Sequence, residues 1–351
     1  MSKRKLTKRQ RLRIQKNQQA LTVRASEQGA VDKLCGDKQS LGQLGQEQPG
    51  LVIAHYGKQV EVESLNTVTD TVIIRRCHFR SNLGSLVAGD RVIWQDGEPN
   101  GLVVAITPRK TELCRPDPYG DLKAIAANVD RLLVVIAPYP EPHSQMIDRY
   151  IVAAEAAAIQ PVLVLNKCDL LDASSGPQLR ALLEMYRSIG YFTLETSATL
   201  ENGLAPLIQI LAGRTSVFVG QSGVGKSSLV NALVPTANTA VGALSTGAQK
   251  GAHTTTTARF FHLSSDGSLI DSPGIRKFGL WHMDEQTILH GFIELRPFIG
   301  HCKFRDCQHL QEPGCQILQA FKDRHICPAR MQSFEHLRNS IRDGKARKTG
   351  R

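Results

Sequence analysis

The sequence has no apolar stretch approaching the about 18 residues that a membrane-spanning helix requires. Its densest apolar runs, residues 132–137 and 161–165, have the length of buried strands. The basic N-terminus also lacks the apolar segment of about 7 to 15 residues that a secretory signal needs. These absences predict a soluble, cytoplasmic protein without a membrane partner.

The cysteine pattern lacks the features of a disulfide framework. Four of the eight cysteines are dispersed, whereas the other four fall within residues 302–327, beside histidines. Clustered cysteines near histidines favour a metal site over disulfides and indicate a reducing compartment. The dispersed cysteines are Cys35, Cys77, Cys114 and Cys168.

Acidic side chains are missing from residues 1–26, which carry nine Lys and Arg residues. The chain has 43 basic and 32 acidic residues and a formal net charge of +11, which favours a polyanionic partner such as nucleic acid. Residues 36–50 are rich in Gly and Gln and are interpreted as a linker. Residues 1–49 are therefore predicted to be a flexible basic arm, which either contacts RNA or only aids solubility. Residues 338–351 form a second basic tail.

Five short segments with strand character lie between residues 50 and 112. Five strands in about 60 residues, without a helical period, predict a small closed barrel of the oligonucleotide-binding (OB) type. Arginines in or beside these strands either line a nucleic-acid groove or cover a solvated face. The expected strands are residues 51–56, 59–63, 71–77, 90–94 and 101–107, and the arginines are Arg75, Arg76, Arg80, Arg91 and Arg109.

Residues 113–280 alternate buried strands with amphipathic helices, which predicts an α/β fold with a mostly parallel sheet. The expected strands are residues 131–137, 161–165 and 215–219, and the expected helices are residues 145–158, 178–189 and 227–233.

A phosphate-binding loop lies between the last of these strands and the last helix. The segment reads Gly, four residues, Gly-Lys-Ser, in the strand-to-helix position that this loop requires. Backbone N–H groups of such a loop surround the phosphates, with Lys226 expected at the β- and γ-phosphates and the Ser227 hydroxyl on Mg²⁺. The expected nucleotide-binding residues here are Gly220, Gln221, Ser222, Gly223, Val224, Gly225, Lys226, Ser227 and Ser228.

A second nucleotide-binding segment, Asp271-Ser272-Pro273-Gly274, follows the apolar residues Leu269 and Ile270. A carboxylate at a strand end can hold Mg²⁺ through water, and the Gly274 N–H can meet the γ-phosphate. Downstream of a phosphate loop, this arrangement favours a nucleotide switch over an ordinary turn.

Base recognition is predicted for Asn166-Lys167-Cys168-Asp169, which follows the strand at residues 161–165. A carboxylate at Asp169 can accept from both the ring N–H and the exocyclic amine of guanine, a donor pair that adenine lacks. Ser197 and Ala198, at the end of the next strand, are expected to offer small side chains and backbone N–H groups to the base edge. The combination predicts GTP and GDP as ligands.

These motifs occur in a permuted order, with guanine recognition first, the phosphate loop second and the switch last. The sequence closely resembles the ribosome small subunit-dependent GTPase A family from about residue 50 to residue 330. The resemblance implies an OB-type barrel, a circularly permuted GTPase domain and a C-terminal α-helical zinc-binding domain. One site can still form, because the carboxyl ends of parallel strands meet at one sheet edge in any chain order.

Residues 251–257 resemble the first switch of that family, in which a threonine closes over Mg²⁺ and the γ-phosphate. The candidates are Thr254, Thr255 and Thr256, and Thr255 is taken for this role. Ile275 stands where small GTPases carry a water-positioning glutamine. His253 is the nearest replacement by motif position and by resemblance, and the alternative is a histidine that only contacts RNA phosphate. The expected catalytic residues are His253, Lys226 and Thr255.

Three thiolates and one imidazole fall within 14 residues near the C-terminus, in Cys302, Cys307, His309 and Cys315. Four protein ligands of this kind predict a closed, structural Zn²⁺ site. Competing ligands are His301, His325 and Cys327, and the family resemblance selects the first four. The predicted zinc domain covers residues 281–351.

The protein is expected to be a monomer. The resemblance implies an enzyme that hydrolyses GTP to GDP and phosphate. It further implies action on the small (30S) ribosomal subunit and its rRNA during late assembly, with assembly factors as further partners. The residues alone predict a GTP-switched RNA-binding protein. One alternative is a nucleotide-gated RNA-binding module with incidental hydrolysis, because the glutamine is absent. The other is a metabolic or transport GTPase without RNA, which leaves the barrel and both basic tails unexplained.

Overall fold

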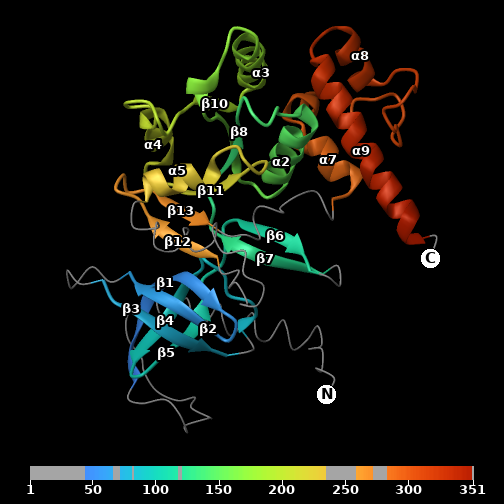
Figure 1. Ribbon diagram of the computed structural model, residues 1–351. Helices are drawn as coiled ribbons and strands as arrows, with labels where there is room; N and C mark the ends of the chain where they lie inside the picture. Colours follow the sequence, from blue (N-terminus) through green and yellow to red (C-terminus); the bar gives the residue numbers. More distant parts are fainter. Residues whose placement is uncertain are drawn as a thin grey trace.

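The computed structural model describes residues 44–65, 72–80, 83–117, 121–234, 258–271 and 283–349, with side chains described up to residue 342. A barrel, an α/β layer and a C-terminal group of helices follow one another along the chain (Figure 1). No helix in these ranges is long and apolar enough to cross a membrane.

Five strands close into the barrel. Their order is β1-β2-β3-β5-β4, and β1 also pairs with β4. All neighbouring pairs are antiparallel except β3 and β5, which are parallel. Alternating side chains, among them Val52, Val60, Val62 and Trp94, point inward and are fully buried. The predicted five-stranded OB-type barrel is thus confirmed. The strands are β1 (Leu44–Tyr56), β2 (Gln59–Ser64), β3 (Ile74–Phe79), β4 (Arg91–Gly97) and β5 (Gly101–Ile106).

Strand β1 begins at Leu44, so the prediction of a linker over residues 36–50 is wrong for residues 44–50. This part of β1 pairs antiparallel with β4, for example Glu47 with Gln95. Its side chains are mostly exposed, and its backbone closes the barrel, so a Gly- and Gln-rich composition is compatible with a strand. Residues 36–43 and the predicted basic arm before them lie outside the described residues.

The α/β layer is a sheet in the order β10-β9-β8-β11-β13-β12, in which only β12 is antiparallel to its neighbour. The central strand β8 is buried on both faces. Leu132, Val134 and Ile136 pack with helices α2 and α3, whereas Leu133 and Val135 pack with α4 and α5. The predicted mostly parallel α/β fold is confirmed. Its strands are β8 (Arg131–Ile136), β9 (Gln160–Leu165), β10 (Phe192–Glu195), β11 (Thr215–Val219), β12 (Arg259–His262) and β13 (Ser268–Asp271); its helices are α2 (Ser144–Ala156), α3 (Ser175–Ile189), α4 (Ala205–Leu211) and α5 (Lys226–Leu233), with a short turn η2 (Cys168–Leu170).

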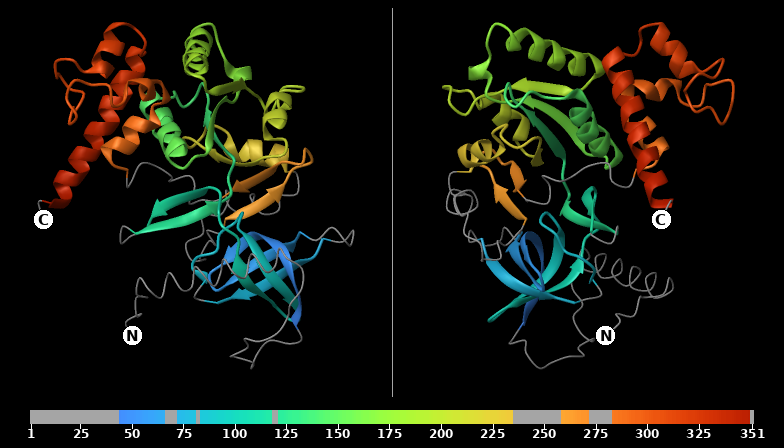
Figure 2. Two further views of the ribbon diagram at one scale, coloured as in Figure 1. Left: turned by 180° about the vertical axis from the view of Figure 1, so that it is seen from behind. Right: turned by 45° about the vertical axis from the view of Figure 1, so that its right-hand side comes forward.

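Strand β12 joins the barrel to the α/β layer. It pairs with β13 on one side and with β1 on the other, through Ala54 and Arg259. His262 Nε2 lies 2.8 Å from Glu63 Oε2 on β2, an ion pair when the imidazole is protonated. A hairpin of β6 (Glu112–Pro116) and β7 (Leu122–Ala127) makes a second connection, which the sequence did not predict (Figure 2).

The C-terminal helices pack beside α2 (Figure 2). Arg330 on α9 is fully buried and forms ion pairs with Asp148 on α2 and with Glu294, whose Oε1 lies 2.6 Å from Arg330 Nε. Its guanidinium also lies 4.4 Å from the centre of the Phe292 ring, and the Tyr186 hydroxyl donates to Asp148 at 2.5 Å. This buried cluster fixes the C-terminal region to the α/β layer. The elements are α7 (Glu285–Gly291), η5 (Ile293–Phe298), α8 (Gln316–Lys322) and α9 (Pro328–Thr349).

Candidate nucleotide site and metal centre

The predicted base-recognition and phosphate-binding segments lie side by side at the carboxyl edge of the sheet. Asn166 Nδ2 donates to Val224 O at 2.9 Å, and Lys167 Nζ donates to Gly223 O at 2.7 Å. Asn166 is almost fully buried, and its Oδ1 has no hydrogen-bond partner among the described residues. Two segments more than 50 residues apart therefore form one continuous edge of a site.

The phosphate loop, residues 220–227, depends on glycine at two close contacts. Gly220 has a φ of +136°, and a Cβ there would lie 2.2 Å from Val135 O. Gly225 has a φ of +95°, and its Cβ would lie 2.3 Å from Asn166 Nδ2. Larger residues would separate the loop from β8 or from the base-recognition segment.

Lys226 begins helix α5 and its ammonium group is held by the loop itself. Nζ donates to Gly220 O at 2.9 Å and also to Gln221 O. Ser222, Ser227 and Ser228 are exposed at the same edge. Solvent therefore reaches this edge of the sheet at the loop backbone, at the partly buried Lys226 and at the exposed Ser227.

Asp271 ends strand β13, which runs parallel to β11 with Ile270 beside Val217. Its carboxylate therefore belongs to the same sheet edge as the phosphate loop, which follows β11. The remaining predicted switch and catalytic residues, Gly274, His253 and Thr255, lie outside the described residues.

The predicted guanine-binding carboxylate, Asp169, is held by Ser197. The fully buried Ser197 hydroxyl lies 2.5 Å from Asp169 Oδ1. This hydrogen bond lowers the pKa of the Asp169 carboxyl below its ordinary value, so the group is ionised at neutral pH. The sequence interpretation assigned Ser197 to the base edge through its size and backbone and missed this role of its hydroxyl.

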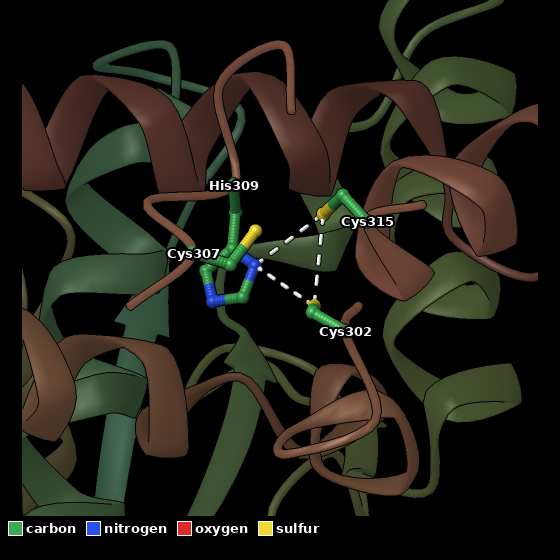
Figure 3. Close-up of side chains that lie close together, drawn as sticks. All are labelled: Cys302, Cys307, His309 and Cys315. Carbon is green, nitrogen blue, oxygen red and sulfur yellow. Dashed lines mark hydrogen bonds between the residues drawn. The ribbon is translucent and has the colours of Figure 1, made fainter. Parts of the chain in front are cut away.

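The predicted zinc ligands Cys302, Cys307, His309 and Cys315 converge, with their ligand atoms all within 4.8 Å of one another (Figure 3). Cys302 Sγ lies 3.9 Å from Cys315 Sγ, and His309 Nδ1 lies 3.5 and 3.4 Å from those two sulfurs. A tetrahedral zinc shell with ordinary bond lengths requires about 3.8 Å between sulfurs and about 3.6 Å between sulfur and nitrogen. The donor set and its spacing therefore fit zinc. The competing candidates His301, His325 and Cys327 are not part of this group.

The loop that carries these ligands is held by Glu312. Its carboxylate accepts from the backbone N–H groups of Gln308 at 2.9 Å and Leu310 at 2.8 Å. Backbone hydrogen bonds, its own N–H first and then that of Leu310, lower the pKa of Glu312 to about 2. His309 lies between the donors Gln308 and Leu310 and has a left-handed backbone conformation with a φ of +56°, and its imidazole faces the sulfurs (Figure 3).

Three of the five barrel arginines are already paired. Arg75 Nε lies 2.8 Å from Asp96, Arg76 Nε 3.6 Å from Glu61, and Arg109 Nε 2.7 Å from the fully buried Asp90. Arg109 therefore has a structural role. Arg80 and Arg91 are exposed and form no ion pair with a described carboxylate.

Residues 106–281 match the family model described as RsgA GTPase. The small ribosomal subunit biogenesis GTPase RsgA of Pseudomonas aeruginosa (strain LESB58) is 55% identical over 346 residues, which cover 97% of this chain and 98% of the relative. The chain belongs to the RsgA GTPase family. The RsgA of Hahella chejuensis (strain KCTC 2396) is 50% identical, with 98% of both chains covered.

Two solved structures agree with this family. The crystal structure of YloQ, a circularly permuted GTPase, has a TM-score of 0.68 at 30% identity and covers 85% of this chain and 96% of its own. YjeQ from Thermotoga maritima has a TM-score of 0.69 at 28% identity and covers 84% and 99%. The predicted family, GTP hydrolysis and circular permutation are therefore confirmed. Membership of a GTPase family also implies the use of a guanine nucleotide and Mg²⁺.

Proposed function

We propose that this protein hydrolyses GTP to GDP and phosphate in a cycle coupled to the small ribosomal subunit, during late assembly of that subunit. This proposal rests on relatives that match this chain over nearly its full length and are named small ribosomal subunit biogenesis GTPases. The hydrogen bonds between residues 166–167 and 223–224 support it, because they join a guanine-recognition segment to a phosphate loop.

In the proposed site, Asn166, Lys167, Asp169, Ser197 and Ala198 bind the base. The backbone of residues 220–225 surrounds the phosphates, and Lys226 exchanges the carbonyls of its own loop for phosphate oxygens. The hydroxyl of Ser227 and the carboxylate of Asp271 are proposed to hold Mg²⁺, and Ser228 is proposed to contact the nucleotide. When bound, Mg²⁺ neutralises charge that develops on the phosphates.

The proposed catalytic residues besides Lys226 are Thr255 and His253, with the Gly274 N–H at the γ-phosphate. Because Ile275 cannot orient water, His253 is proposed to do so when the protein is bound to small subunits. His253→Ala is then expected to bind GTP and subunits nearly normally and to lose stimulated turnover by about 10²- to 10⁴-fold. Weaker subunit binding with full turnover at saturating subunits would instead make His253 an RNA contact.

We propose that Cys302, Cys307, His309 and Cys315 hold one structural Zn²⁺, since four protein ligands leave no open position for a reacting group. The zinc-ordered loop and helix α9 are tied together, because Arg338 Nη1 donates to Gln308 O at 2.9 Å. The ion would thus order the C-terminal domain rather than take part in hydrolysis.

The proposed RNA contacts are Arg80 and Arg91 of the barrel and the basic residues of segments 1–26 and 338–351, except Arg338, which is buried, and Arg342, which pairs with Glu285. Phosphate contacts of this kind weaken steeply with salt. We propose that the protein is cytoplasmic and monomeric. Its co-sedimentation with small subunits should decrease as salt rises. Salt-independent association would contradict an rRNA partner, and assembly factors could then account for it.

A second candidate function is a nucleotide-gated RNA-binding module with incidental hydrolysis, which the missing glutamine favours. The two functions differ in turnover. A large increase in GTP hydrolysis on addition of small subunits supports the enzyme, whereas nucleotide-dependent binding without such an increase supports the module.

A further inference from the structure

Thr199 lies two residues after Ser197, outside the expected nucleotide-binding residues. Its backbone N–H donates to Ser197 Oγ at 3.2 Å, and its own Oγ1 lies 2.9 Å from the same oxygen. Ser197 Oγ in turn lies 2.5 Å from Asp169 Oδ1. Two residues of the loop after β10 therefore converge on the carboxylate that would read the base.

The direction of each hydrogen bond in this chain follows from donor counting. The ionised Asp169 carboxylate can only accept, so the single hydroxyl proton of Ser197 must point to it. Ser197 Oγ must then accept in its other contacts, which makes Thr199 the donor through its N–H and its hydroxyl. The Thr199 hydroxyl also interacts with the Asp169 carboxylate itself. Thr199 thus fills both acceptor positions of Ser197 and leaves its proton no other orientation.

We propose that Thr199 is a specificity-determining positioning residue of the guanine site. By fixing the Ser197 hydroxyl, it fixes the plane of the Asp169 carboxylate, which must face two guanine donors at once. Its contact with nucleotide is indirect, through Ser197 and Asp169. This proposal rests on the assignment of Asp169 to guanine recognition made under the proposed function.

The expected effect is modest because Thr199 is exposed and water can replace part of its contribution. Thr199→Val removes the hydroxyl donor, keeps the side-chain shape and keeps the backbone N–H. Loss of one hydrogen bond of this kind corresponds to about 2- to 10-fold in affinity. GDP should lose this affinity, whereas inosine diphosphate, which lacks the exocyclic amine, should lose less, so the preference for GDP over inosine diphosphate falls.

The experiment titrates the full-length protein with GDP and with inosine diphosphate, for the wild type and for each variant. Thr199→Ser should keep the wild-type preference for GDP, because serine also carries a hydroxyl donor. Thr193→Val is the matched control, since Thr193 lies on β10 and its Oγ1 has no hydrogen-bond partner in the part of the chain that the structure describes. In the Ser197→Ala background, Thr199→Val should have a smaller effect than in the wild type, because only the interaction of Thr199 with Asp169 itself is left to lose. A purely structural role would not produce this dependence. With GTP as substrate, the KM should rise while kcat changes little.

An unchanged preference in Thr199→Val, or an equal loss in the Ser197→Ala background, would overturn the proposal while leaving the guanine assignment intact. A wild-type protein that binds GDP and inosine diphosphate equally, together with an Asp169→Asn variant of unchanged affinity, would overturn the assignment of Asp169 and this proposal with it. The two failures are therefore distinguishable.

Discussion

Replacement of Arg330 by methionine tests what holds the C-terminal helices against the α/β layer. The guanidinium is fully buried between Asp148 and Glu294, which are themselves fully and mostly buried. Removal of one partner from such a cluster leaves uncompensated charge and costs about 3 to 5 kcal/mol. Against a total free energy of unfolding of about 5 to 15 kcal/mol, this is a large loss.

Arg342→Met is the matched control on the same helix. Arg342 pairs with Glu285, but both side chains are 33% exposed, so its loss should cost no more than about 1 kcal/mol. Both variants are compared with the wild type by denaturant unfolding and by proteolysis of the native protein. Asp148→Asn should recover part of the stability that Arg330→Met loses, because it removes the unpaired charge.

The pH dependence of the loss gives a second criterion. Burial already raises the pKa of Asp148, and without Arg330 the carboxyl can relieve its charge only by binding a proton. The destabilisation by Arg330→Met should therefore be smaller in mild acid than at neutral pH. A loss equal to that of Arg342→Met at every pH would refute the account of this cluster.

Four further changes have defined outcomes. Asp169→Asn should weaken GTP binding and shift preference toward the xanthine nucleotide, whose carbonyl complements the amide; an unchanged guanine affinity in a titration would contradict this. Lys226→Ala should abolish hydrolysis by removing the charge at the β- and γ-phosphates, and turnover at the wild-type rate would show that the loop is not the catalytic phosphate site. Cys307→Ser, or chelation, should release zinc and unfold the C-terminal region locally while nucleotide binding persists, and metal analysis of the wild type without zinc would disprove the site. The hydrogen bond with Glu63 raises the pKa of His262, so the stability that this pair contributes is present below about pH 6.5 and is lost as pH rises through the raised value; Glu63→Gln should remove this dependence, worth at most about 1 kcal/mol at this half-exposed position, as followed by denaturant midpoints across that range.

The features that were predictable from the sequence are local in the chain. The phosphate loop, the segment at residues 166–169 and the cysteine cluster each lie within 14 residues or fewer, and their spacing alone specifies backbone geometry and donor set. The five barrel strands were predictable because turn residues separate them. Each of these predictions uses short-range information only.

The unpredicted features depend on contacts between distant residues. Arg330 and Asp148 are 182 positions apart, and a buried arginine on a largely polar helix has no sequence signature. The first part of β1 is specified by backbone pairing with β4, which composition does not record. The hydroxyl chain from Thr199 to Asp169 also needs the parallel alignment of β9 with β10, with Leu165 beside Glu195.

The most direct test of the proposed function is GTP turnover by the purified protein with and without purified small ribosomal subunits. Turnover should be slow alone, because Ile275 replaces a water-positioning glutamine, and should rise strongly and saturably with small subunits. Large subunits serve as the control and should not reproduce the increase. A rate that small subunits leave unchanged, measured under low-salt conditions in which the protein co-sediments with them, would contradict the account.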